Sequence, residues 1–152
     1  MRPATEVLLT EYLKQLKLTA ILRVYAARAR EARNTGSDYE DYLLSLMESE
    51  LEVRADNRLK RRIRDARFPV MKTMEGFSFE EAEGLDKRLV REMAEGTYIK
   101  EKRNIIFVGK TGTGKTHLAT ALGLEACRQG VRTRFVTGAG LVNELIEARS
   151  ER

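Results

Sequence analysis

The sequence predicts a chain of the α/β class, in which an all-helical N-terminal module precedes the first part of a domain with a parallel sheet. Two observations predict it. Apolar residues recur at helical spacing from the N-terminus to Phe68-Pro69. After residue 104, two short apolar runs alternate with two amphipathic segments. The order strand, loop, helix, strand, helix is typical of parallel α/β sheets.

Composition narrows the class of protein. The chain has 152 residues, of which 42% are apolar and 34% are charged, a balance typical of folded globular proteins. No apolar run approaches the roughly 18 residues of a membrane-spanning helix, and the N-terminus lacks a secretory signal. We therefore expect a cytoplasmic protein with no membrane partner. The single cysteine, Cys127, provides neither a disulfide nor a metal-ligand set.

The N-terminal module, expected over residues 1–70, contains three helical patterns. Predicted helices span Val7 to Leu16 and Ala20 to Ala32, with apolar residues three or four positions apart. A third, longer helix carries an apolar stripe from Tyr39 to Ile63. It ends at Phe68-Pro69, because the residue before a proline disfavours helical backbone angles. Together these helices predict a small all-α module.

The charges on the long helix are divided along its length. Residues 38–52 hold six acidic and no basic residues, whereas residues 54–72 hold eight basic residues. A solvated face is one interpretation, since helix dipoles favour this order of charge. A surface that follows DNA phosphates is the other. Its candidate DNA-binding residues are Arg54, Arg58, Arg61, Arg62 and Arg64.

Residues 71–103 are expected to form a connector with one short helix. The segment Gly76-Phe77-Ser78-Phe79 carries two aromatic rings that we expect to pack against another part of the chain. A short helix is predicted from Asp86 to Ala94, and Gly96 ends it because glycine favours helix C-termini.

A glycine-rich segment follows the apolar run Ile105–Val108, which has the length of a buried parallel strand. Residues 109–116 match the pattern G-x-x-x-x-G-K-[ST], which cradles nucleotide phosphates between a strand and a helix. Its glycines let backbone N–H groups surround an anion. Lys115 would reach the β- and γ-phosphates of ATP, and the Thr116 hydroxyl would ligate Mg²⁺. The candidate cofactor-binding residues are Gly109, Lys110, Thr111, Gly112, Thr113, Gly114, Lys115, Thr116 and His117.

The remainder of the expected domain, residues 104–152, follows this loop. A helix is predicted from Lys115 to Cys127, then a strand from Thr133 to Thr137 and a helix from Leu141 to Arg149. His117, the only histidine, stands in the first turn of the first of these helices. A packing role for its ring is the favoured alternative to contact with the ligand.

Several of these segments together resemble the IstB family. The family comprises ATP-binding helper proteins of bacterial insertion-sequence transposition, relatives of the DnaC-type helicase loaders within the AAA+ ATPases. The resemblance covers nearly the whole chain in the family's order. Its segments are Asn57–Ile63, Ala66–Pro69, Gly76–Phe79, Gly84–Asp86, Thr116–Ala119 and Leu122–Cys127, together with the glycine-rich loop.

The resemblance implies a P-loop domain of the AAA+ type that binds ATP with Mg²⁺. It also implies assembly on duplex DNA as an ATP-bound oligomer that presents a target site to a transposase. The implied partners are therefore DNA, the transposase of the same element, and further copies or relatives of the chain. The N-terminal helices would serve assembly and contact with DNA or a partner.

The chain departs from the family at its C-terminal side. The family pattern continues with an acidic Walker B strand, sensor residues and an arginine finger, so we expect a C-terminally truncated chain with little or no ATP hydrolysis. In the family's sheet the two strands expected here are not neighbours. Since isolated strands are marginal in water, the nucleotide-binding half is expected to be looser than the helical module.

Two further classes of function are consistent with the sequence. A non-catalytic fragment could act only through helical contacts with DNA or a partner. A small P-loop kinase would share the loop, but such kinases usually begin at the strand before it, which the basic helical leader argues against.

Overall fold

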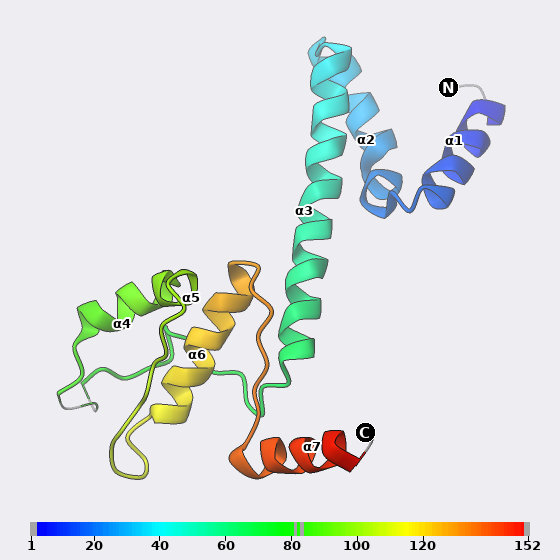
Figure 1. Ribbon diagram of the computed structural model, residues 1–152. Coiled ribbons are helices and arrows are strands. Elements are labelled where there is room, and N and C mark those ends of the chain that lie inside the picture. Colours follow the sequence, from blue (N-terminus) through cyan, green and yellow to red (C-terminus); the bar gives the residue numbers. More distant parts are fainter. Residues whose placement is uncertain (1–2, 81, 83, 151–152) are drawn as a thin grey trace. The chain divides into compact units, whose positions relative to one another are not determined.

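The computed structural model describes residues 3–80, 82 and 84–150, and within these residues it contains seven helices (Figure 1). The expected helices are confirmed, with ends shifted by a few residues. The four-residue helix α5 was not predicted. The helices are α1 (Pro3–Gln15), α2 (Thr19–Thr35), α3 (Tyr39–Ala66), α4 (Lys87–Ala94), α5 (Thr97–Lys100), α6 (Lys115–Arg128) and α7 (Gly138–Ser150).

The prediction of an α/β fold is wrong for this structure, because the described residues contain no strand. Residues 105–108 and 133–137 are irregular, and no ladder joins either of them to another segment within the described part of the chain. A strand exists only where a neighbour completes its hydrogen bonds, so a suitable local sequence is not sufficient. Ile106 and Val108 are accordingly 83% and 91% exposed.

The chain divides into two compact units, residues 1–58 and residues 59–152. This division falls within α3, whereas the domain bounds expected at residues 70 and 103 stay predictions. The first unit comprises α1, α2 and residues 39–58 of α3. In it, α2 lies beside α3 (Figure 1). Its core consists of Leu13, Ile21, Tyr25 and Leu46, with partly buried neighbours that include Leu9, Leu22 and Tyr42.

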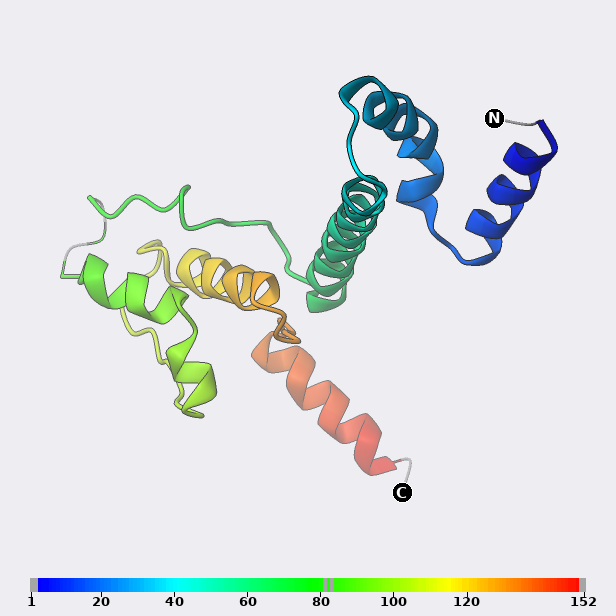
Figure 2. The same ribbon diagram turned by 90° about the horizontal axis from the view of Figure 1, so that it is seen from above.

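The second unit has its core between α4 and α6, which lie side by side in both ribbon views (Figures 1 and 2). Phe77, Val90, Leu118 and Leu122 are buried there. Ile105 and Phe107 pack against this core with one side of their segment. The segment that leads to the glycine-rich loop is therefore anchored on α4 and α6, although it belongs to no sheet.

The end of α3 is fixed within the second unit by contacts to α6 and to the segment after it. Phe68 lies against the middle of α6, where a Cβ on Gly123 would be 2.9 Å from its ring. The carbonyl of the fully buried Ala66 accepts the backbone N–H of Phe135 at 2.8 Å. The basic residues at 59–66 are therefore carried on a helix end that is tied to α6.

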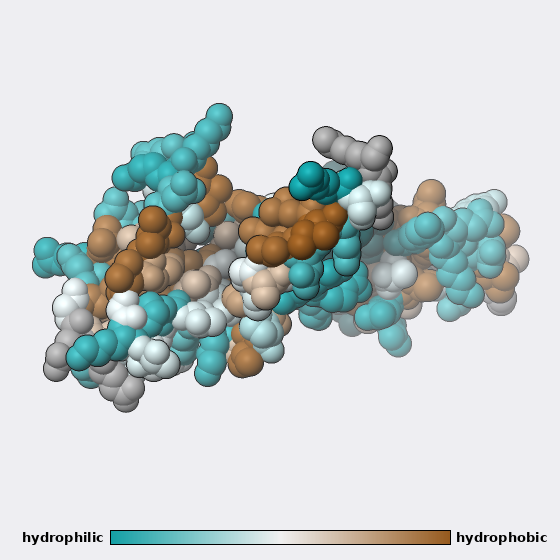
Figure 3. Space-filling view, turned by 60° about the horizontal axis from the view of Figure 1, so that its bottom comes forward, coloured by the Kyte–Doolittle hydropathy of each residue, from teal (hydrophilic) through white to brown (hydrophobic). Residues whose placement is uncertain are grey.

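Hydrophobic residues reach the surface in several places (Figure 3). No residue of α7 is buried, and its aliphatic side chains at 141, 142, 145 and 146 are 45 to 62% exposed. None of the described helices has the length and apolar content needed to span a bilayer.

Candidate phosphate-binding loop

The glycine-rich loop leads directly into the N-terminus of α6. Gly112 and Gly114 have φ angles of 85° and 78°, in the left-handed region that favours glycine. Gly114 is the N-cap residue directly before α6, and its carbonyl accepts the N–H of Leu118 at 2.9 Å. The N–H groups of residues 115–117 thus precede the first bond of the helix and remain available to a ligand.

The side chain of Lys115 lies across the loop. Its ammonium group donates to the carbonyl of Lys110 and, at 3.3 Å, to the hydroxyl of Thr113. The same hydroxyl donates to the carbonyl of Lys110 at 2.8 Å. A Cβ on Gly109 would lie 3.2 Å from Thr113 Oγ1, so the loop is closed tightly on itself at this point. These bonds place the positive charge of Lys115 beside the backbone of Lys110 and the side chain of Thr113.

The electrostatic setting of the loop favours an anion. The first turn of α6 contains no acidic residue, and the positive end of the helix dipole points toward the loop. Thr116 is exposed in this turn, which leaves its hydroxyl accessible to solvent. Within the described residues, no group of three or more His, Cys, Asp or Glu side chains could hold a metal ion.

His117 points away from the loop and into the unit's interior. Its Nε2 lies 2.9 Å from the carbonyl oxygen of Thr73, and its ring packs edge-on against Phe77 at 5.3 Å between centroids. Phe77 in turn packs edge-on against Phe79 at 5.0 Å. The sequence left the packing site of the two aromatic residues open. The structure places the connector on the first turn of α6.

The five arginines proposed for DNA contact have different surroundings. Arg54, in the first unit, pairs with the buried carboxylate of Glu50 at 2.9 Å, and Arg58 is exposed there. In the second unit Arg61 is exposed, whereas Arg62 is half-buried with its guanidinium close to Gly130. Arg64 contacts Asp65 at 3.4 Å but keeps 77% of its side chain exposed.

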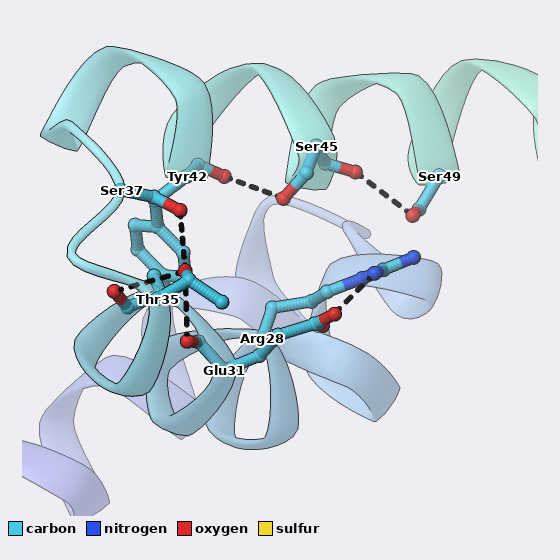
Figure 4. Close-up of polar contacts among 8 residues, drawn as sticks. Arg28, Glu31, Thr35, Ser37, Tyr42, Ser45 and Ser49 are labelled. Carbon is cyan, nitrogen blue, oxygen red and sulfur yellow. Dashed lines mark hydrogen bonds and ion pairs between the residues drawn. The ribbon is translucent and has the colours of Figure 1, made fainter.

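Two shallow hollows add no second candidate site. One of about 130 Å³, in the second unit, is lined by parts of α4 and α5 and by residues 103–105, with no loop residue among them. The other, of about 260 Å³, lies in the first unit between the end of α2 and the start of α3 (Figure 4). Polar groups around it bond to one another, as in Arg28–Glu31 at 3.1 Å and Thr35–Ser37 at 2.6 Å. The contact of Thr35 with Ser37 lies in the turn between the two helices, whereas Arg28 and Glu31 are one turn apart on α2.

A glycine-rich loop at a helix N-terminus, with a lysine across it, is an arrangement suited to binding an anion. Comparison with known families assigns the chain further. The family model of IstB-like ATP binding proteins matches residues 11–152. The chain belongs to this family.

Relatives with insertion-sequence names match over most of the chain. One, named as an ATP-binding protein of insertion sequence IS5376 from Geobacillus stearothermophilus, is 34% identical over 141 residues, which are 93% of this chain and 56% of the relative. The corresponding protein of IS21 from Pseudomonas aeruginosa is 32% identical over 139 residues, which are 91% of this chain and 52% of the relative. The chain thus spans slightly more than half the length of these relatives.

Proposed function

We propose that this chain is an ATP-binding component of insertion-sequence transposition and that residues 109–116 hold the phosphates of ATP. Membership of the IstB-like family supports ATP as the ligand. The observation that carries the proposal is the passage from Gly114 into α6, which leaves the N–H groups of the helix start unpaired beside the Lys115 ammonium. This is the arrangement that backbone recognition of phosphate requires.

Each part of the loop has a role in this proposal. The backbone of Gly109 to Gly114 surrounds the β-phosphate, and Lys115 leaves the carbonyl of Lys110 to bind the β- and γ-phosphates. The hydroxyl of Thr116 would be one ligand of a Mg²⁺ bound together with the nucleotide, where the metal would supply neutralisation of phosphate charge. The residues of the loop orient the bound nucleotide.

Calorimetric titration of MgATP into the whole chain tests this function. A Lys115→Ala variant should bind about ten-fold or more weakly, because a charge-assisted hydrogen bond is lost. Lys14→Ala is the matched control, since it removes the same charge from an exposed position on α1. Binding that is absent in the wild type, or equal in wild type and Lys115→Ala, would contradict the proposal. In that case action through helical contacts alone becomes the better interpretation.

DNA is the second ligand that we propose, with the basic residues of α3 as its contact. Arg58, Arg61 and Arg64 support it best, because their side chains are exposed, whereas Arg54 is committed to the buried Glu50. Arg61 and Arg64, which are both in the second unit, are exposed and three residues apart, so they lie on one side of the helix and can follow a phosphate backbone.

A mobility-shift titration at several salt concentrations tests the DNA contact. Arg61→Ala and Arg64→Ala should each weaken binding to duplexes of any sequence, and each should lower the salt slope by about 1. Arg30→Ala, on the exposed side of α2, is the control for a general loss of charge. Unchanged affinity and salt slope in both α3 variants would refute the contact.

The protein partners that we propose are the transposase of the same element and further copies or relatives of this chain. This part of the proposal rests on the resemblance to the IstB family described above. Sedimentation of the chain with and without MgATP and duplex DNA tests self-association. A mass that stays that of one chain under all four conditions would contradict it.

A further inference from the structure

The connector that precedes α4 is fastened to the start of α6 by one long-range hydrogen bond. The Thr73 carbonyl is an acceptor, so the Nε2 of His117 carries the proton of the 2.9 Å bond between them. The two residues are 44 positions apart in the sequence. The neighbouring Gly76 and Phe77 amides donate to the Thr73 hydroxyl at 3.3 Å and to the Met74 carbonyl at 3.2 Å. Residues 73–77 are thereby held in a defined turn.

Phe77, the last residue of this turn, contacts the phosphate-binding loop directly. A Cβ placed on Gly114 would lie 2.7 Å from Phe77 Cε2, so the ring rests directly on the backbone of the last loop glycine. Phe77 is 9% exposed and belongs to the core formed with Val90, Leu118 and Leu122. The backbone of Gly114, with its φ of 78°, is therefore covered by a ring that cannot move without disturbing the core.

We propose that His117 and Phe77 are positioning residues for the phosphate site. Through Phe77 they hold Gly114 in the left-handed conformation that aims the N–H groups of the helix start into the loop. The inference rests on the proposed binding of ATP phosphates by this loop. A loop that is already ordered loses less conformational entropy when it binds. The contacts of His117 and Phe77 therefore raise the affinity of the loop for the phosphates.

The coupling between the connector and the loop must act in both directions. If the turn at residues 73–77 favours the form of the loop that binds phosphate, a bound nucleotide must stabilise that turn by the same factor. The amides of Gly76 and Phe77 report this stabilisation, because both are hydrogen-bonded only while the turn is formed. The connector thus senses whether the phosphate site is occupied.

Hydrogen exchange of the whole chain, with and without saturating MgATP, tests the inference. In the wild type, nucleotide should slow exchange several-fold both in the loop and at residues 73–79. His117→Gln places an N–H donor close to the position of Nε2 and should keep the connector response. His117→Leu has similar bulk but no donor. It should bind MgATP about five-fold more weakly, as loss of one hydrogen bond implies. Nucleotide should then slow hydrogen exchange in its loop but not at residues 73–79.

The outcomes separate this inference from the proposed function. Absence of any nucleotide-dependent protection in the wild type removes both. Protection of the loop without protection of residues 73–79 overturns the inference and leaves ATP binding intact. The wild-type result decides the question even if His117→Leu does not fold. A connector response in His117→Leu equal to that of the wild type would likewise refute the role of the hydrogen bond.

Discussion

The carboxylate of Glu50 accepts the backbone N–H of Ala20 at 2.9 Å, which joins α3 to the beginning of α2. The same oxygen accepts the N–H of Ile21 at 3.3 Å, and the other oxygen accepts Arg54 Nε at 2.9 Å. Glu50 is only 5% exposed. A buried acid on the long helix therefore serves as the N-terminal cap of α2, a function that the sequence pattern did not reveal.

Replacement of Glu50 should destabilise the first unit. Glu50→Gln keeps only one acceptor oxygen, so either Arg54 or the two N–H groups of α2 lose their partner, and we expect the free energy of unfolding to fall by about 1–3 kcal/mol. Urea denaturation followed by circular dichroism measures it. Glu52→Gln, an exposed change on the same helix, should have little effect. Equal midpoints for the two variants would contradict the capping role.

The same carboxylate predicts a pH dependence. Burial raises the pKa of Glu50, but hydrogen bonds from Arg54 and from the N–H groups of Ala20 and Ile21 outweigh burial, so its pKa lies below the ordinary 4.5. Stabilisation by the ionised form is therefore present above pH 4.5 and is lost as the pH falls through the lowered pKa. Acid titration of the wild type should show a loss of stability below pH 4.5 that Glu50→Gln largely lacks.

Gly123 should tolerate no side chain, although it lies inside a helix. A Cβ there would be 2.9 and 3.0 Å from two ring carbons of Phe68. Gly123→Ala should therefore lower the free energy of unfolding by about 1–3 kcal/mol. Without this contact, replacing a glycine inside a helix by alanine would raise it by about 1 kcal/mol. Gly138→Ala is the control, since nothing lies within 4 Å of its Cβ position. A Gly123→Ala melting temperature above that of the wild type would refute the contact.

Two lysines occupy helix ends where glycine is usual. Lys17 after α1 and Lys102 after α5 have φ of 56° and 55°, the left-handed form that Gly36 and Gly130 take after other helices. The residue after each lysine donates its N–H to the carbonyl five positions before it, at 2.9 and 2.8 Å, which is the Schellman closure of a helix. A side chain in this conformation is strained, whereas glycine is not.

Glycine at these ends should stabilise the unit that contains it. We expect Lys17→Gly and Lys102→Gly each to raise the free energy of unfolding by about 0.5 kcal/mol, the relief of strain less the added entropy of the unfolded chain. Alanine at the same positions keeps the Cβ and should give no gain. Chemical denaturation of the four variants checks this, and glycine variants weaker than their alanine counterparts would disprove the strain.

The helices could be predicted because their signals are local. Apolar spacing placed six of the seven described helices within a few residues, and the expected start of α4 at Asp86 is confirmed by its side chain, which accepts the N–H of Arg88 at 2.7 Å. The two strands predicted from local signals are absent from the described residues. Ile105–Val108 and Thr133–Thr137 have suitable residues, but strand formation depends on partner segments that local sequence does not specify.

Only the part of the candidate site that depends on local sequence could be predicted. The loop and the helix start after it follow from the spacing of glycines with Lys115 and Thr116. The contact between His117 and Thr73 does not, because no periodic pattern links residues 44 positions apart. The signals that existed were a histidine in the first turn of α6 and a pair of aromatic residues in a connector without regular structure.

Backbone-amide NMR spectra of the ¹⁵N-labelled chain, titrated with MgATP, test the central claim most directly. Saturable shifts should be largest at the amides of Gly109, Gly112 and Gly114 and in the first turn of α6, because these N–H groups would donate to phosphate oxygens. Lys115→Ala should need a markedly higher MgATP concentration for the same shifts. Glycine amides that stay in place while MgATP perturbs only other regions would contradict the assignment of this loop as the ATP site.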